Sequence, residues 1–555
     1  MPAQQQKRVA IVGAGCAGLS AAYALSLSPD AFEGTVYDGA PQVGGSATSH
    51  ALPPGFGAEY LNEGVQGAPE TFRNTFNLFH DVLGFQSKEI EMQISFGKGE
   101  NFWTNIFPTQ LIEEHKDNIK RFGGTLSTIK RFEPIFALVP VSKLLPLFRY
   151  PPAFGERIVF PLVALFFGTG NETRHISSAI LARVFLDPSM RIFDYSPDSF
   201  LASLPTMLAF PELGRLYGAF RTLVEEAGNV KVRTSRAVTA VLRGAAARKA
   251  GGANVVIRSC ATDEEGKPTG EQEEEESFDE LVLCCDADSA LKILKAGSGP
   301  SWKENKILGN VKYFWDISVT HHDKPYMQKH YELDHTDRWN ADRKDKETQE
   351  SFKWAKENWA PLYLIEEDEK DPGSITMSFD LTTYQPQFYG DPAVGKGARR
   401  TLENAPPTER VGKDEWKTKE HPLKDIKEGE QPRIYQTIFL DRDGFSHRWS
   451  RDEIDKEKIL MEKWWKQQSH RWQHLVGTVA LMWAINGTQH TRYAGGWTLV
   501  NMHESAVVSG FAAVYQLGAS YPFAQDEEAA RLFKLYLALA HMSRARKEDR
   551  QGFFA

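Results

Sequence analysis

Three glycines near the start of the chain, in the pattern Gly13-x-Gly15-x-x-Gly18, constrain its fold more than any other feature. The apolar run RVAIV precedes them, a helical pattern follows, and a second apolar run, TVYD, ends at Asp38, twenty residues after Gly18. In such a strand-helix-strand unit the glycines permit a tight turn, close approach of a pyrophosphate and close packing of the helix, while the acid accepts hydrogen bonds from a ribose. Residues 8–38 therefore predict a dinucleotide-binding βαβ unit.

The paired glycines Gly44 and Gly45, shortly after Asp38, favour FAD over NAD. The runs VAIVGAGCAGLSAAYAL and TVYDGAPQVGGS resemble the extended FAD fingerprint shared by amine oxidases, protoporphyrinogen oxidases, carotenoid desaturases and FAD-dependent fatty acid double-bond isomerases. An Arg or His commonly follows the glycine pair in that superfamily, where this chain has Ser46. The resemblance implies that FAD is bound here by Gly13, Gly15, Ala17, Gly18, Asp38, Gly44, Gly45 and Ser46.

Further matches lie along the chain. FGAEYLNEGVQGAPETF and ILGNVKYFWDISVTHHDKPYMQ resemble a poorly characterised branch of amine oxidase-like FAD proteins, and VRTSRAVTAVLR resembles the strand whose valine, here Val238, meets the adenine. TRYAGGWTLVNMHESAVVSGFAAVYQL resembles the segment that places flavin over a helix N-terminus, which implies contacts from Gly495, Gly496 and Glu504. No cysteine lies near this segment in the sequence, so we expect non-covalent FAD.

The order of patterns predicts the architecture. We expect an α/β protein with a Rossmann-like FAD-binding domain of the glutathione reductase type, a mixed α+β substrate domain and a helical cap. The FAD-binding domain is predicted to be discontinuous, from residues 7–98, 225–300 and 470–520. The substrate and cap domain takes residues 99–224 and 301–469, and residues 521–555 form a C-terminal helix.

Composition and charge exclude several classes of function. The net charge is -8 and no Lys/Arg block accompanies the aromatic segments, so we expect no nucleic-acid partner. The four cysteines show neither a disulfide framework nor zinc spacing. The histidines between His321 and His335 lack an ordered ligand spacing, so we expect no metal. Without a visible signal peptide or membrane-spanning segment, a cytoplasmic location is expected.

The C-terminal segment leaves open a peripheral membrane contact. Leu532, Leu535, Leu539 and Met542 recur at helical spacing, which predicts a helix with an apolar face. Such a face mostly packs against the core, and a membrane-surface or partner-binding role is the alternative. The oligomeric state cannot be inferred from the sequence.

The cap region is strongly apolar and suggests the class of substrate. Its run at 148–170 holds Phe160, Leu162, Val163, Leu165, Phe166 and Phe167. These side chains form either a channel for an unsaturated lipid or the packed core of the cap. Three functions stay open: hydride abstraction from a small hydrophobic, lipid-like substrate (desaturation or double-bond isomerisation), amine oxidation with release of hydrogen peroxide, and a flavin-binding scaffold without turnover.

Candidate catalytic residues come from the segments near the expected flavin. They are His503, Glu504, Trp497, Tyr493 and Lys312. His503 and Glu504 could exchange protons at the flavin edge or cap a helix. Tyr493 and Trp497 would form an aromatic cage for an amine, and Lys312 resembles the lysine that often holds a water near the flavin in the superfamily.

Overall fold

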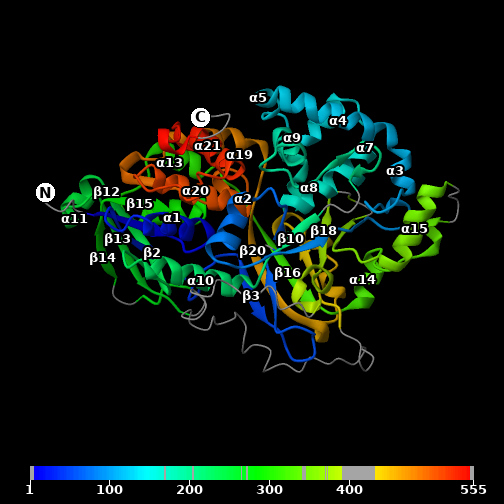
Figure 1. The fold of residues 1–555 in the computed structure, drawn as a ribbon, viewed down its shortest axis with the longest axis horizontal. Coiled ribbons are helices and arrows are strands. Elements are labelled where there is room, and N and C mark those ends of the chain that lie inside the picture. Colours follow the sequence, from blue (N-terminus) through cyan, green and yellow to red (C-terminus); the bar gives the residue numbers. More distant parts are fainter. Residues whose placement is uncertain are drawn as a thin grey trace.

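The computed structural model describes residues 6–64, 66–167, 170–202, 206–263, 266–270, 273–340, 345–368, 371, 373–389 and 432–550. The charged insert between residues 390 and 431, part of the predicted 301–469 segment, lies outside the described residues. The chain forms two lobes side by side: one carries the strands β1, β2 and β15 with both termini, and the other carries the cap helices and the strands β16 to β20 (Figure 1).

The first lobe is built on a five-stranded parallel sheet. Its strands, in spatial order, are β11 (Val230–Arg233), β2 (Phe32–Tyr37), β1 (Lys7–Val12), β15 (Glu280–Leu283) and β21 (Thr491–Tyr493). In the central strand, Ile11 pairs with Val36 on one side and Val282 on the other. Both faces are covered, which explains why these strands are continuous apolar runs.

Two helices cover the sheet and approach each other closely. They are α1 (Cys16–Ser26) and α20 (His503–Tyr515). A Cβ added at Gly510 would lie 2.1 Å from the carbonyl oxygen of Ala17, and one at Gly18 would lie 1.8 Å from that of Gly13. Only glycine therefore permits these two approaches.

An antiparallel meander flanks this sheet. It comprises β12 (Arg236–Arg243), β13 (Val255–Ala261) and β14 (Glu274–Phe278). The acidic side chains of β14 are paired across the meander, for example Glu275 with Arg258 at 2.8 Å. Helix α10 (Leu213–Glu226), which falls within the predicted cap segment 99–224, packs against α1 and β11 of this lobe.

The second lobe contains a six-stranded mixed sheet. Its order is β20 (Ile459–Gln468), β16 (Tyr313–His321), β19 (Tyr435–Phe439), β18 (Ile375–Asp380), β17 (Tyr363–Glu367) and β7 (Ile94–Phe96). The strand β7, inside the predicted 7–98 segment, pairs in parallel with β17 of this sheet. Alternate residues of β19 and β18 face the interior between the lobes, as the period of two requires, whereas the end of β20 contributes consecutive residues, 465–468.

Short helices form the cap of the second lobe. They are α3 (Gln110–Glu114), α4 (Lys116–Arg131), α5 (Glu133–Phe136), α6 (Val141–Leu147), α7 (Pro152–Phe154), α8 (Phe160–Phe167) and α9 (Ser178–Leu186). The buried face of α4 carries Phe122, whose ring contacts the rings of Phe154 and Phe200. In α8, Leu162 and Val163 are fully buried in this core. The side chains of Phe166 and Phe167 lie outside the described part of the chain.

The C-terminal helix α21 (Glu527–His541) packs on the first lobe through a face that differs from the predicted one. Its buried residues are Ala529, Ala530, Leu532, Phe533, Tyr536, Leu537 and Ala540. Leu535 is exposed, and Met542 lies beyond the helix end in a left-handed conformation with its side chain in solvent. The prediction that Leu535 and Met542 belong to the apolar face of this helix is therefore wrong. The side chains that contact the core lie next to Leu532 on the face that carries Phe533 and Tyr536.

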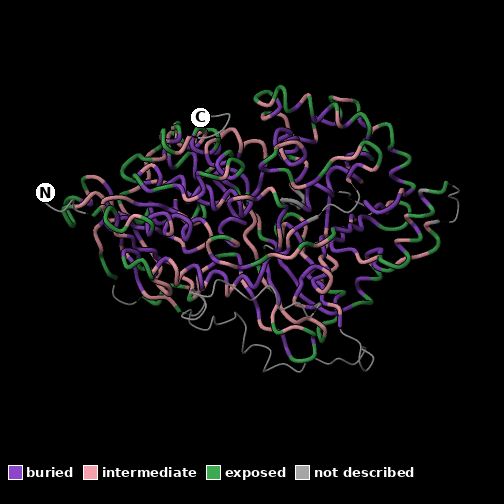
Figure 2. Tube along the Cα trace, viewed as in Figure 1, coloured by how far each residue is buried: buried purple, intermediate pink, exposed green. Residues whose placement is uncertain are grey.

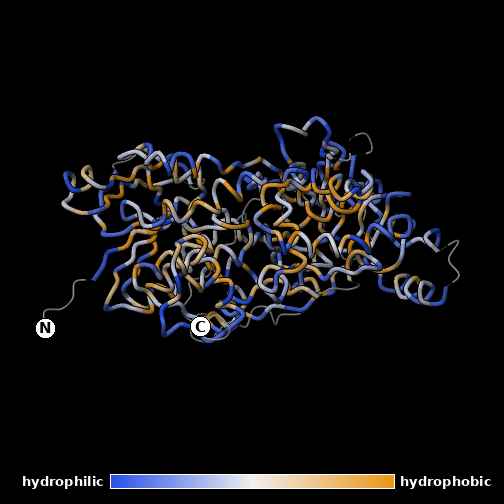
Figure 3. Tube along the Cα trace, turned by 90° about the horizontal axis from the view of Figure 1, so that it is seen from above, coloured by the Kyte–Doolittle hydropathy of each residue, from blue (hydrophilic) through white to orange (hydrophobic). Residues whose placement is uncertain are grey.

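Buried segments run through the middle of both lobes, and exposed segments form their periphery (Figure 2). Apolar segments are gathered in the interior in the same way (Figure 3). No helix among the described residues is both long and apolar enough to cross a membrane.

Candidate functional site

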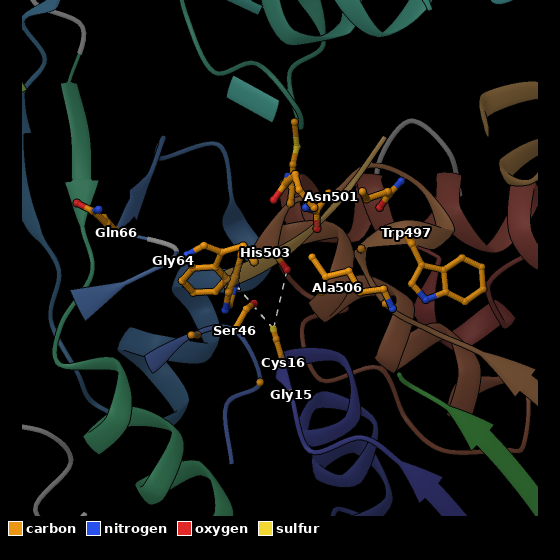
Figure 4. A pocket seen from close by; sticks show the side chains of 18 of the residues that line it. Gly15, Cys16, Ser46, Gly64, Gln66, Trp497, Asn501, His503 and Ala506 are labelled. Atoms are coloured by element: carbon orange, nitrogen blue, oxygen red, sulfur yellow. Dashed lines mark hydrogen bonds between the residues drawn. The ribbon is translucent and has the colours of Figure 1, made fainter. Parts of the chain in front are cut away.

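One cavity of about 770 Å³ connects the glycine turn of the first lobe with the sheet of the second. At one end it is lined by Gly13, Gly15 and Asp38, and at the other by side chains of β16 to β20. The predicted site residues Ala17, Gly44, Gly45, Ser46, Gly495, Gly496, Trp497 and His503 also line it. Figure 4 shows Cys16 and His503 near the centre of this region, with Ser46 and Gly64 on one side and Trp497 on the other.

The turn after β1 has the geometry of a phosphate-binding loop. Gly13 has a φ of +107°, which favours glycine, and α1 begins directly after Gly15. The Asp38 carboxylate accepts hydrogen bonds from the backbone N–H of Ala14 at 2.6 Å and of Ala40 at 2.8 Å. Asp38 thus fixes the turn and keeps further oxygen lone pairs for ribose hydroxyls.

The glycine pair folds back onto this turn. The Gly44 N–H donates to the carbonyl oxygen of Ala14 at 2.9 Å, and Gly44 and Gly45 have φ values of +116° and +63°. The nearest atom to a Cβ added at Gly15 would be Gly45 Cα, at 3.7 Å. The two glycine segments therefore form one cradle with backbone on both sides.

His503 stands at the start of α20 and faces the cavity. Its Nε2 accepts a hydrogen bond from the Tyr217 hydroxyl at 2.6 Å, and its Nδ1 lies 3.0 Å from Thr75 Oγ1. Cys16 Sγ lies 3.8 Å from the same Nδ1 (Figure 4). Burial lowers the pKa of His503 to about 3, so the imidazole is neutral at physiological pH.

Glu504, the next residue, does not line the cavity. Its carboxylate accepts hydrogen bonds from the backbone N–H groups of Asn74 and Thr75 and from both of their side chains, at 2.7 to 2.9 Å. These two residues lie in the first turn of α2 (Arg73–Phe76). Glu504 therefore satisfies unpaired N–H groups at that helix N-terminus, a structural function.

The remaining predicted residues divide between the cavity and its surroundings. The Trp497 indole N–H donates to the carbonyl oxygen of Cys285 at 3.0 Å beside the cavity. Tyr493 donates to Glu304 at 2.6 Å in a buried network and does not line the cavity. Lys312 is exposed and also lies outside the lining. Val238 is partly buried in β12, likewise outside the lining.

An ionic cluster that the sequence did not indicate lies where the cavity meets β20. Glu63 is fully buried, with its carboxylate 3.1 Å from Lys463 Nζ and 2.9 Å from His50 Nε2. Lys463 also donates to Thr48 Oγ1 at 3.0 Å and lies 4.1 Å from the ring centroid of Trp465. Burial alone would raise the pKa of Glu63, but the hydrogen bond from His50 and the charge of Lys463 hold it below its usual range.

Two amides extend this cluster into the cavity. The Gln436 amide lies 3.5 Å from Glu63, and Gln66 donates to Gln436 at 3.0 Å. On the neighbouring strand, the Asp316 carboxylate lines the cavity and accepts a hydrogen bond from the Asp441 N–H at 2.7 Å. Burial raises the pKa of Asp316 to about 7.

Beyond the polar cluster the cavity becomes an apolar chamber. Its lining includes Leu165, Ile192, Phe193, Met207, Tyr363, Met377, Phe379, Tyr384, Ile438 and Leu440. These side chains come from the cap, from the second sheet, from β10 (Thr206–Ala209) and from α16 (Leu381–Tyr384), which explains why no single stretch of sequence identified them. Among the described residues, no group of three or more side chains could hold a metal ion.

Comparisons with known proteins agree with this geometry. Residues 11–82 match the family model of the NAD(P)-binding Rossmann-like domain. A putrescine oxidase variant superposes with a TM-score of 0.56 at 12% identity, covering 93% of this chain and 99% of that one. The chain has the overall fold of this oxidase. No curated protein matches the sequence.

Two further solved structures extend this likeness in fold. A putative protoporphyrinogen oxidase from Exiguobacterium sp. 255-15 has a TM-score of 0.51 at 13% identity, with 93% of this chain and 99% of that chain covered. Cyclohexylamine oxidase from Brevibacterium oxydans IH-35A has a TM-score of 0.51 at 8% identity, with 93% and 100% covered. The predicted fold class is confirmed by this agreement over nearly the whole chain.

Proposed function

We propose that the protein is an FAD-dependent oxidoreductase that abstracts a hydride from a hydrophobic, unsaturated, lipid-like substrate. The observation that carries this proposal is the continuous cavity that joins the glycine cradle to an apolar chamber. A dinucleotide held at the cradle would share this cavity with a substrate in the chamber, and apolar walls suit an acyl or polyene chain.

The residues present fit FAD. Gly13, Gly15, Gly44 and Gly45 line the cavity with backbone that a pyrophosphate would approach, and the Asp38 carboxylate in the same lining would accept hydrogen bonds from a ribose. The first N–H groups of α20 have no acceptor within the helix and would stabilise negative charge at the flavin. When bound, FAD supplies the acceptor for two electrons and one hydrogen.

The chain itself must exclude water and handle the proton. In a desaturation, one hydrogen leaves the substrate with two electrons and the other leaves as a proton. Asp316 lines the cavity, and burial raises its pKa to about 7, so its carboxylate can take up and release a proton near neutral pH. We therefore assign the proton acceptor role to Asp316 rather than to the fully hydrogen-bonded His503.

Amine oxidation is the second candidate. Putrescine oxidase and cyclohexylamine oxidase share the fold, and the Asp316 carboxylate could hold an ammonium group. The predicted cage residue Tyr493 is bonded to Glu304 outside the cavity, which weighs against this candidate. A flavin scaffold without turnover is the third.

We also propose that FAD is held without a covalent bond. Three thiols, those of Cys16, Cys284 and Cys285, line the cavity, although none is near residue 495 in the sequence. Burial raises the pKa of Cys16 and of Cys285 to about 12, so both remain protonated and are weak nucleophiles. Acid precipitation of the purified protein should release the yellow colour into the supernatant; colour retained in the pellet would contradict non-covalent binding.

Product analysis tests the substrate class. The protein purified with FAD is incubated in air with unsaturated fatty acids, carotenoids or amines, followed by mass spectrometry of the lipids and by peroxide detection. We expect a new or moved double bond in a lipid. Peroxide with amines alone would favour the second candidate, and bound FAD without any product would favour the scaffold.

A further inference from the structure

An exposed apolar surface lies on the outer side of the cap, away from the cavity. It is formed by Phe132, Ile135, Leu138 and Leu147, which we call the cap patch. Ile135 is 62% exposed and Leu147 is 64% exposed. These four fall within sixteen positions, and no other stretch of that length among the described residues holds four large exposed apolar side chains. Such clustering on a surface indicates a contact site.

The cap patch is held firmly by the helix beneath it. The Ser177 hydroxyl donates to the Ala137 carbonyl oxygen at 3.0 Å, and the Ser178 hydroxyl donates to that of Val139 at 2.7 Å. The rings of Phe136 and Phe148 lie 6.0 Å apart, which joins α5 to α6. The segment that carries the cap patch is therefore tied to the start of α9, and α5 lies at the outer end of the cap (Figure 1).

The charge around the cap patch is opposite to that of the molecule. The chain has a net charge of -8, yet residues 130–149, which carry the cap patch, contain four basic side chains and one acidic side chain. The basic residues are Lys130, Arg131, Lys143 and Arg149. The acid, Glu133, is paired with Arg183 at 2.5 Å. The segment therefore carries excess positive charge around its apolar side chains.

We propose that the cap patch docks on the surface of an anionic lipid bilayer. Phe132, Ile135, Leu138 and Leu147 enter the boundary between headgroups and acyl chains, and the surrounding Lys and Arg side chains contact the headgroups. Contact surfaces between proteins are depleted of Lys, whereas apolar side chains ringed by Lys and Arg match an anionic membrane. The membrane contact is thus assigned to the cap and not to α21, whose apolar face is buried.

Vesicle flotation with the full-length, FAD-containing protein tests this docking directly. We expect the protein to float with phosphatidylcholine vesicles that contain about 30% phosphatidylserine, and to bind roughly tenfold or more weakly to phosphatidylcholine alone. High salt should weaken the binding to the anionic vesicles because it screens the basic side chains. This test is independent of the proposed function, because it requires no turnover.

Two double variants with matched controls locate the contact. Ile135→Ser with Leu147→Ser, and Arg131→Glu with Lys143→Glu, should each reduce binding to the anionic vesicles roughly tenfold or more. The controls are Trp302→Ser, an exposed apolar residue of the other lobe, and Lys292→Glu with Lys295→Glu, exposed on α12 (Ala287–Ala296). Both controls should bind like the parent protein. Flavin content and melting temperature report whether each variant is folded.

Three results would overturn the proposal. The first is no flotation of the parent protein with anionic vesicles at low salt. The second is equal loss of binding in the cap patch variants and their controls. The third is a change of oligomeric state in the cap patch variants with vesicle binding unchanged, which would make this face a contact between proteins. The salt series on the parent protein keeps the proposal testable even if a variant fails to fold.

Discussion

Gly15 and Gly18 lie three residues apart in one turn, yet a methyl group would meet different surroundings at each. At Gly15 the nearest atom would be 3.7 Å away and φ is -76°, whereas at Gly18 it would be 1.8 Å from the Gly13 carbonyl oxygen. Of these two positions, the fold itself therefore requires glycine only at Gly18. The open space at Gly15 fits the proposed approach of a pyrophosphate to the backbone.

This contrast predicts separable effects of two substitutions. Gly15→Ala should leave the unfolding free energy of the FAD-free protein within about 1 kcal/mol of the parent and lower FAD affinity at least about tenfold. Gly18→Ala should destabilise the FAD-free protein as well, because the turn must open. Denaturant unfolding and FAD titration measure the two quantities; unchanged FAD affinity in Gly15→Ala would contradict a pyrophosphate at this turn.

Asp316 gives the protein a predicted pH dependence. Burial raises its pKa to about 7, while a carboxyl in an unfolded chain ionises near about 3.9. At pH values between these two pKa values, the folded state therefore binds one more proton at Asp316 than the unfolded state does. The contribution of Asp316 to stability is full at low pH and is lost as the pH rises towards 7.

Asp316→Asn should remove that dependence. Relative to the parent, the variant should gain unfolding free energy as the pH is raised from about 5 to about 7.5, measured by urea unfolding at both values. Asp337→Asn, on an exposed side chain, is the control and should show no such change. A constant difference between Asp316→Asn and the parent across this range would show that Asp316 does not titrate there.

At the level of single residues, the sequence identified the backbone part of the candidate site and missed its polar side chains. The glycines and Asp38 lie close together in the chain, so their spacing carries the information. Glu63 and Lys463 come from opposite ends of the chain and meet only after the second sheet has formed. Trp465, two positions after Lys463, shares its face, but alternation alone does not tell which face lines a cavity.

Among the elements, the N-terminus of α20 has two roles, one towards the cavity and one towards α2. The helix begins at His503, inside the segment in which the family resemblance implied a helix N-terminus. The helix start contributes His503 and Ala506 to the lining of the cavity, while the Glu504 side chain turns away and satisfies the start of α2. When a side chain of one helix caps the N-terminus of another helix, no local sequence pattern reveals it. The sequence therefore left open whether Glu504 exchanges protons or caps a helix.

Removal of the Glu504 carboxylate, which accepts hydrogen bonds at the start of α2, should destabilise the fold without altering the chemistry. Glu504→Ala should lower the free energy of unfolding by about 3 kcal/mol, because it leaves buried N–H groups unpaired. Glu528→Ala, at a mostly exposed carboxylate of α21, should change it by less than about 0.5 kcal/mol. Turnover per bound FAD should be unchanged in both variants. A large loss of turnover per FAD in Glu504→Ala would contradict the structural assignment.

In the whole molecule, the two lobes meet at one cavity, and this arrangement was predictable in outline. The glycine fingerprint and the return of strand patterns after the cap predicted the α/β fold, which the comparisons confirm. The predicted domain boundaries remain predictions, with β7 and α10 packing across them. The chamber was not predictable, because its lining is assembled from the cap and from several strands.

Filling the chamber should separate cofactor binding from substrate binding. Met207→Trp, at a chamber residue, should reduce turnover of long unsaturated chains roughly tenfold or more while FAD content stays near that of the parent. Met542→Trp adds the same bulk at an exposed position outside the cavity and should have no effect. Equal turnover by both variants would mean that the substrate does not enter the chamber.

The most direct test of the account is anaerobic mixing of the FAD-containing protein with unsaturated fatty acids, carotenoids or amines, followed by the absorption band of oxidised flavin. The account predicts that the band disappears with an unsaturated lipid and that Met207→Trp abolishes this loss. Loss of the band with amines alone, or its persistence with every lipid, would contradict hydride abstraction from a substrate held in the apolar chamber.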